Sequence, residues 1–275
     1  MSSTSGDSSV LLWVASACIA FLGARAFVEY LRRLNYDGPV RLWRELLLGA
    51  GALAAGIWAS LVIDVSAKGL VFEVGFHPAK IFGSLLLACV AMAAVVGWAT
   101  FRANWLVQLA AALLAGLVGL IVQVAVLWSI GAEPGLTWRS EPLMFSLLLL
   151  FSGLALGGRM VVGARRGSSA DRGSRRLMAA LVLAACVVAS QELVLTASGL
   201  DRQVVSAHAR FLPEVAISLV AGAVVPIVLV LLLVDQRTQQ RARAADRVRR
   251  RRRNPGADTG TGESVFADPS SHDTR

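Results

Sequence analysis

Seven apolar runs of about 20 residues, separated by short charged stretches, constrain the fold of this chain most strongly. A helix of that length crosses a hydrocarbon core of about 30 Å. Because a backbone in lipid must satisfy its own hydrogen bonds, each run is predicted to be a helix. Only 16% of the residues are charged, against about a quarter in an ordinary soluble domain. The sequence therefore excludes a soluble enzyme, and the runs do not alternate in polarity as outer-membrane barrel strands do.

The predicted fold is all-α: a polytopic bundle of seven transmembrane helices. Residues 1–9 are read as a short outer segment, 10–234 as the membrane domain and 235–275 as a cytoplasmic tail. The first 24 residues contain no Lys or Arg, so the first run is expected to remain as a span and not to be a cleaved signal peptide. The spans are predicted at Val10–Val28, Leu46–Val65, Ile81–Phe101, Trp105–Ile130, Leu143–Val162, Leu177–Ala197 and Val215–Val234.

Basic residues predict the orientation of the bundle. With the N-terminus outside and the C-terminus inside, 22 of the 27 Lys and Arg residues lie on the cytoplasmic side. The exceptions are Lys68, Lys80, Arg139, Arg202 and Arg210. Positive charge concentrates in cytoplasmic loops, so this division favours seven spans over six or eight. The expected location is the bacterial cytoplasmic membrane, in multi-pass form.

Two basic stretches on that side differ in composition. The 163–176 loop is rich in Gly, Ser and Arg, which is typical of a flexible linker. The tail is predicted to begin as a helix over Gln236–Arg253, ending in the run Arg249, Arg250, Arg251, Arg252 and Arg253. Such a run beside a span favours anionic lipid headgroups over nucleic acid as the partner. A cytoplasmic signalling partner is a further expectation.

The second span resembles the MHYT integral membrane sensor domain, a seven-span module of bacterial signalling proteins. That family would read Gly-Ile-Trp-Ser-Met-His-Phe-Ile-Gly where this chain has Gly56 to Asp64. The matching positions are Gly56, Ile57, Trp58 and Ile63, whereas Ser60, Leu61 and Asp64 replace the family's Met, His and Gly. In the sixth span, Gln191 and Glu192 take the places of the family's Met and His. The resemblance implies a sensory module.

The family's Met and His residues are thought to hold copper, for which thioether and imidazole are suitable ligands. Here no predicted span has adjacent Met and His residues, and all three His lie in loops or the tail. We therefore expect no cofactor and no metal. A weaker alternative is a His/carboxylate site, because the spacing matches no tight ligand motif. Its residues would be His77, His208, Glu73, Asp201 and Glu214.

Several polar residues inside the spans are candidates for sensing a ligand. Glu192 lies near the outer end of the sixth span, and a carboxylate in a bilayer is expected to face the bundle interior or water. Asp64 ends the second span, one helical turn after Ser60. If Asp64, Glu192 and Gln123 converge, they form a polar pocket that opens outward. The full set is Glu192, Gln191, Asp64, Ser60, Trp58 and Gln123, although Trp58 is also typical of an interfacial aromatic belt.

Three function classes remain open. The first is a non-enzymatic sensory or signalling module of the MHYT type without its metal. The second is a transporter-like bundle for a small solute or protons, and the third is a structural scaffold for a partner protein. Transport is disfavoured because only Glu192 is read as an acid inside a span and Pro226 is the one mid-span proline. No catalytic signature is present, so no enzyme is expected.

Overall fold

The computed structural model describes residues 4–33, 39–68, 75–100, 104–133, 136–163, 169–199, 205–206 and 212–253. The chain divides into two units, 1–232 and 233–275. The helices are α1 (Thr4–Arg33), α2 (Pro39–Ala67), α3 (Pro78–Thr100), α4 (Trp105–Trp128), α5 (Ser140–Gly163), α6 (Ser169–Ser198), α7 (Glu214–Leu219), the π-helix η2 (Val220–Val224) and α8 (Val225–Arg253). The second unit holds the part of α8 after Leu232.

Within the described residues, seven helical segments are long and apolar enough to cross a membrane, which confirms the predicted all-helical fold with seven candidate spans. The seventh, Val215–Gln239, comprises α7, η2 and the first part of α8. The predicted helical start of the tail is confirmed, since α8 continues to Arg253. The predicted linker over 163–176 is partly wrong, because α6 begins at Ser169.

Large apolar side chains cover the outside of the helices. On α3, Leu86, Leu87 and Val90 are 58–67% exposed, and on α4, Leu113 and Leu117 are also exposed. In water, an apolar surface of this kind would mark an interface or an aggregation site. In a bilayer it faces lipid tails, so the exposed surface agrees with the apolar composition of the spans.

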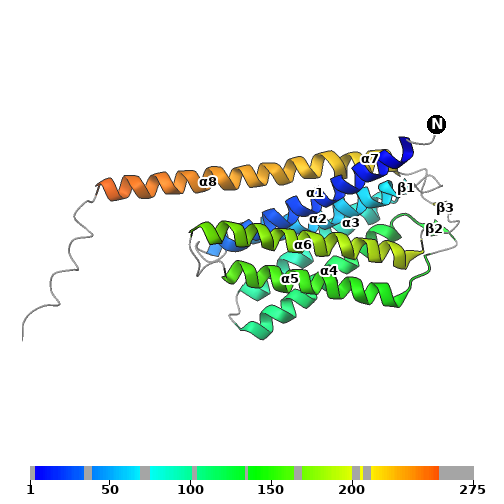
Figure 1. Ribbon diagram of the computed structural model, residues 1–275, viewed down its shortest axis with the longest axis horizontal. Coiled ribbons are helices and arrows are strands. Elements are labelled where there is room, and N and C mark those ends of the chain that lie inside the picture. The colour runs from blue at the N-terminus through cyan, green and yellow to red at the C-terminus, as the bar shows by residue number, and fades with distance from the viewer. Residues whose placement is uncertain are drawn as a thin grey trace, which may run out of the picture. The chain divides into compact units, whose positions relative to one another are not determined.

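Successive spans of the first unit run in opposite directions (Figure 1). We call the end where α2, α4 and α6 finish and α3, α5 and α7 start the Lys68 end. Two short antiparallel ladders join its connections: β1 (Gly75–Phe76) with β4 (Leu212–Pro213), and β2 (Ala132–Glu133) with β3 (Val205–Ser206). These strands were not predicted, because a two-residue strand leaves no periodic signal in a sequence.

Two glycines allow α1 and α2 to pack with their backbones in contact. A Cβ built on Gly56 would lie 2.9 Å from the Cα of Gly23. A Cβ on Gly23 would in turn lie 2.9 Å from the backbone oxygen of Ala52. Small residues at such a crossing let membrane helices associate through close van der Waals contact. Gly56 is therefore a packing residue. Its contact with Gly23 holds α2 close to α1 just before the segment that bears Ser60 and Asp64.

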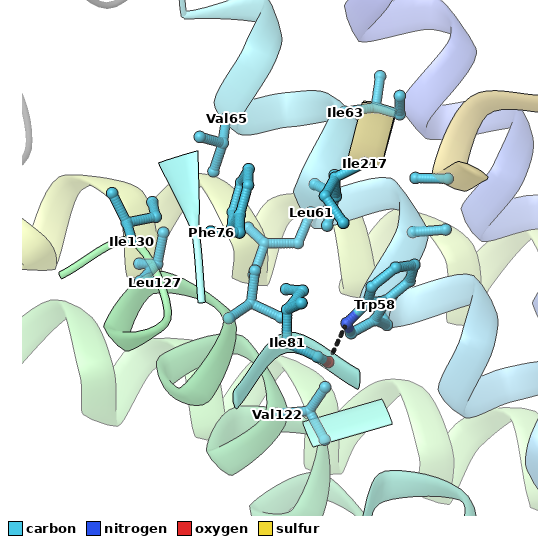
Figure 2. Close-up of a cluster of buried hydrophobic side chains, with 14 of the residues drawn as sticks. Trp58, Leu61, Ile63, Val65, Phe76, Ile81, Val122, Leu127, Ile130 and Ile217 are labelled. Carbon is cyan, nitrogen blue, oxygen red and sulfur yellow. Dashed lines mark hydrogen bonds between the residues drawn. The ribbon is translucent and has the colours of Figure 1, made fainter. Parts of the chain in front are cut away.

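Buried apolar side chains form two clusters within the first unit. The cluster nearer the Lys68 end surrounds Trp58 and includes Leu61, Phe76 and Ile81 (Figure 2). The other contains Phe27, Leu46, Leu53 and Met92. α2 contributes to both clusters and is the most deeply buried span, with 78% of its membrane window inside the structure. A polar residue on α2 is therefore surrounded by protein and not by lipid.

Candidate functional site

An open pocket of about 240 Å³ lies at the Lys68 end of the bundle. Helix α1 supplies Val10 and Trp13, and α6 supplies Glu192. The end of α2 supplies Asp64 and Ala67, and Lys68 follows directly. The pocket thus combines three charged side chains with apolar walls, and it brings together two of the sequence-predicted residues, Asp64 and Glu192.

Asp64 is the buried acid of this pocket. The residue is only 1% exposed, and neither carboxylate oxygen has a hydrogen-bond partner. Ser16 of α1 is its neighbour of hydrogen-bonding type, and Glu192 and Lys68 act on it through their charges. The Ser16 hydroxyl is also buried, and its oxygen is outside hydrogen-bonding geometry. A buried polar group without a partner is destabilising, so Asp64 lowers the stability of the folded protein.

Glu192 is placed differently from the prediction. Its side chain is 37% exposed and accepts a 2.8 Å hydrogen bond and ion pair from the Lys68 Nζ. The prediction had Glu192 pointing inward, within reach of polar groups of the second or fourth span. Its partner is instead Lys68, which was predicted to lie in an outer loop, and Glu192 is not buried in the bundle. The physical reason is Lys68, which stands at the end of α2 and holds the carboxylate at the mouth of the pocket.

Gln191, next to Glu192, is fully buried instead. Its side-chain amide donates to the Ser60 Oγ at 2.6 Å and to the Ile57 carbonyl at 3.0 Å. Ser60 donates to the Gly56 carbonyl of its own helix at 2.7 Å. The structure therefore joins these two candidates in one contact between α2 and α6. That contact lies outside the pocket lining, one helical turn before Asp64 on α2.

Gln123 does not reach the pocket. Its Oε1 accepts a 3.0 Å hydrogen bond from Ser190, and Ser190 lies 2.9 Å from Ser146 between their hydroxyl oxygens. All three side chains are buried, so they form a second polar contact, between α4, α5 and α6. The predicted convergence of Asp64, Glu192 and Gln123 therefore holds for the first two only.

Trp58 is a core residue. It is 0% exposed, and its indole N–H donates to the Ile81 carbonyl at 3.2 Å (Figure 2). It also stacks on Phe82, with ring centroids 6.4 Å apart. The reading of Trp58 as part of an interfacial belt is wrong for this reason. Trp128 and Trp13 are 68% and 46% exposed, and those values agree with an interfacial position.

Sequence reasoning missed several charged residues of the bundle. Glu29 and Glu45 are buried toward the opposite end from Lys68, and Glu29 pairs with Arg25 at 3.0 Å. The count of one intramembrane acid was therefore too low. Lys68 was assigned to a loop, although it lies four residues after Asp64. That spacing could have indicated a shared helical face.

The described residues contain no group of three or more His, Cys, Asp or Glu side chains that could hold a metal. Among the residues of the alternative His/carboxylate site, His208 lies outside the described residues, as do Glu73 and Asp201. The backbone N–H of His77 donates to the Ser129 carbonyl at 2.9 Å, which joins the start of α3 to the end of α4. His77 thus takes part in the packing of the Lys68 end.

Comparisons with protein-family models, with curated proteins and with solved structures give no match for this chain. The resemblance to the MHYT domain accordingly remains a prediction from the residues around Trp58.

Proposed function

We propose that this chain is a non-enzymatic sensory module of the cytoplasmic membrane, with the Asp64 pocket as its input site. The observation that carries the proposal is a buried, unpartnered carboxylate in an open pocket. Ionisable residues inside membrane proteins are costly and are usually retained for function. The module is of the MHYT type in its span count and in the Gly-Ile-Trp motif of α2, but not in its metal ligands.

The proposed orientation places the Lys68 end outside and the tail in the cytoplasm. The division of basic residues supports it, and it opens the pocket to the exterior. The arginines from Arg249 to Arg253 then meet anionic headgroups of the inner leaflet, each contributing about 1 kcal/mol. A signalling partner would contact the same cytoplasmic side.

The helix that bears Asp64 also contacts the seventh span. The Ser66 and Ser218 hydroxyl oxygens lie 2.7 Å apart, joining α2 to α7. A Cβ on Gly222 would lie 3.2 Å from the Cδ1 of Ile63, so η2 packs closely against α2. π-Helical turns inside longer helices are frequent at functional sites. We infer that a change at Asp64 passes through these contacts to the seventh span, which continues into α8.

A label on α8 tests whether the pocket communicates with the tail. An environment-sensitive fluorophore is attached to Ala242→Cys after Cys18, Cys89 and Cys186 have been replaced by alanine. Neutralising the pocket with Asp64→Asn should shift the emission of the label in protein reconstituted into vesicles. The charge-matched control is Glu141→Gln, at the exposed start of α5, which should leave the emission unchanged.

Identical spectra for the Asp64→Asn variant and its parent would contradict a sensory role and leave the scaffold reading in its place. Uptake of solute by the same vesicles would instead favour the transporter. Solute uptake is worth measuring because three acids are buried within the described helices: Glu29, Glu45 and Asp64.

A further inference from the structure

The charges in the pocket do not balance. Lys68 and Glu192 neutralise each other in a 2.8 Å ion pair. Asp64 lies one helical turn before Lys68, yet neither of its oxygens accepts a hydrogen bond. Three ionisable side chains therefore leave one formal negative charge beside the cavity, and the group that bears it is nearly inaccessible to water. A ligand with one positive charge would complete a second ion pair.

The walls indicate which kind of cation fits. Hard metal cations require six or more oxygen ligands, whereas the lining offers the carboxylates of Asp64 and Glu192 among apolar groups. The cavity of about 240 Å³ holds about eight water-sized groups, at about 30 Å³ each. Trp13 is 46% exposed and lines the same cavity, and an indole ring offers a large apolar surface for the hydrocarbon part of a ligand.

We infer that the pocket binds a small organic ammonium ion, with its ammonium group paired to Asp64 and its apolar part against Trp13 and Val10. This inference rests on the proposed function, because it names the class of ligand that the input site recognises. Lys68 stays on Glu192 in the bound state. Without that partner, Lys68 could turn to Asp64, its neighbour one helical turn away, and fill the place of the ligand.

Binding of n-butylammonium to the full chain in detergent tests the inference directly. A ligand-detected NMR titration should show saturable binding of the ammonium ion, and little binding of n-butanol or butyrate at the same concentration. Asp64→Asn keeps the shape of the side chain and removes its charge. It should weaken binding by at least about tenfold, as expected for the loss of a charge-assisted hydrogen bond. Glu141→Gln should bind as the wild-type protein does.

The Lys68→Gln variant should change the affinity for n-butylammonium in the opposite direction, because it removes a positive charge from the pocket. It makes the formal charge of the pocket more negative, from minus one to minus two, so n-butylammonium should bind several-fold more tightly at low salt. The gain should shrink at high salt, because screening shortens the range of the charges. Glu192→Gln should weaken binding, since it frees Lys68 to pair with Asp64. Equal binding of n-butanol and n-butylammonium, or unchanged affinity in Asp64→Asn, would overturn the inference.

The two proposals can fail separately. If the α8 label responds to Asp64→Asn but n-butylammonium does not bind, the pocket is an input site for another class of ligand. If n-butylammonium binds and the label does not respond, the site exists without the proposed signalling route.

Discussion

The Asp64→Asn variant should be more stable than the wild-type protein. The carboxylate is buried with both oxygens unpartnered, and an unsatisfied buried group costs about 1–3 kcal/mol, more when it is charged. Asparagine keeps the shape and removes the charge, so part of that cost disappears. A substitution is expected to stabilise a protein where the native residue serves function and lowers the stability of the fold. The measurement is the midpoint of thermal unfolding in detergent, which should rise by about 2–4 °C per kcal/mol.

Glu29→Gln is the matched control, because it also converts a buried carboxylate into an amide. Glu29 pairs with Arg25 at 3.0 Å and with Arg32 at 3.8 Å. Removal of its charge should lower the midpoint, since the partly buried side chains of Arg25 and Arg32, 25% and 27% exposed, lose their carboxylate partner. A lower midpoint for Asp64→Asn as well would mean that Asp64 has a structural partner and is not held in reserve for a ligand.

The Gly56→Val variant should disrupt the bundle more than any other single change considered. A Cβ at this position lies 2.9 Å from the Gly23 Cα, where backbone cannot yield as a flexible side chain can. Valine must push α1 and α2 apart, at a cost toward the upper end of about 1–3 kcal/mol or beyond. We expect a large loss of folded protein, measured as the monodisperse fraction after size-exclusion chromatography.

Gly158→Val in α5 gives the comparison. No heavy atom lies within 4 Å of a Cβ built at Gly158, so the same side chain meets open space there. The yield of folded protein should stay close to that of the wild type. Equal losses at Gly56 and Gly158 would show that any β-branched residue in these helices is harmful, and that close packing of α1 on α2 is not the cause.

The spans could be predicted because their signal is long and local. A helix in lipid needs about 20 apolar residues, and all seven runs supply them. Helix ends were less well placed, since α6 begins at Ser169 within a segment of Gly, Ser and Arg. The π-helix η2 was not foreseen. Its residues, Val220–Val224, continue the apolar pattern of the span, and nothing in their composition distinguishes a wider turn.

The pocket could be predicted only in part, because it depends on which faces of three helices meet. Asp64 and Glu192 were singled out by their charge in apolar surroundings, and both line the cavity. The different positions of two adjacent side chains on α6 could not be predicted. Gln191 turns into the core toward Ser60, whereas Glu192 turns to Lys68. Trp13 and Ser16 carry no charge, and nothing in their residue types predicts that they lie beside Asp64.

Labelling of one cysteine tests whether an open, negatively charged pocket faces the exterior. Ala67→Cys lines the pocket and is introduced into the variant without native cysteines. Intact cells receive membrane-impermeant thiol reagents, one bearing trimethylammonium and the other sulfonate. At about 6 Å and an effective dielectric constant of about 40, one charge is worth ~1.4 kcal/mol, or about tenfold in rate. We expect both reagents to label the cysteine from outside. Because the charge speeds one reagent and slows the other, Asp64→Asn should lower the ratio of cationic to anionic rates about a hundredfold. No labelling in intact cells, or a ratio unchanged by Asp64→Asn, would contradict this account.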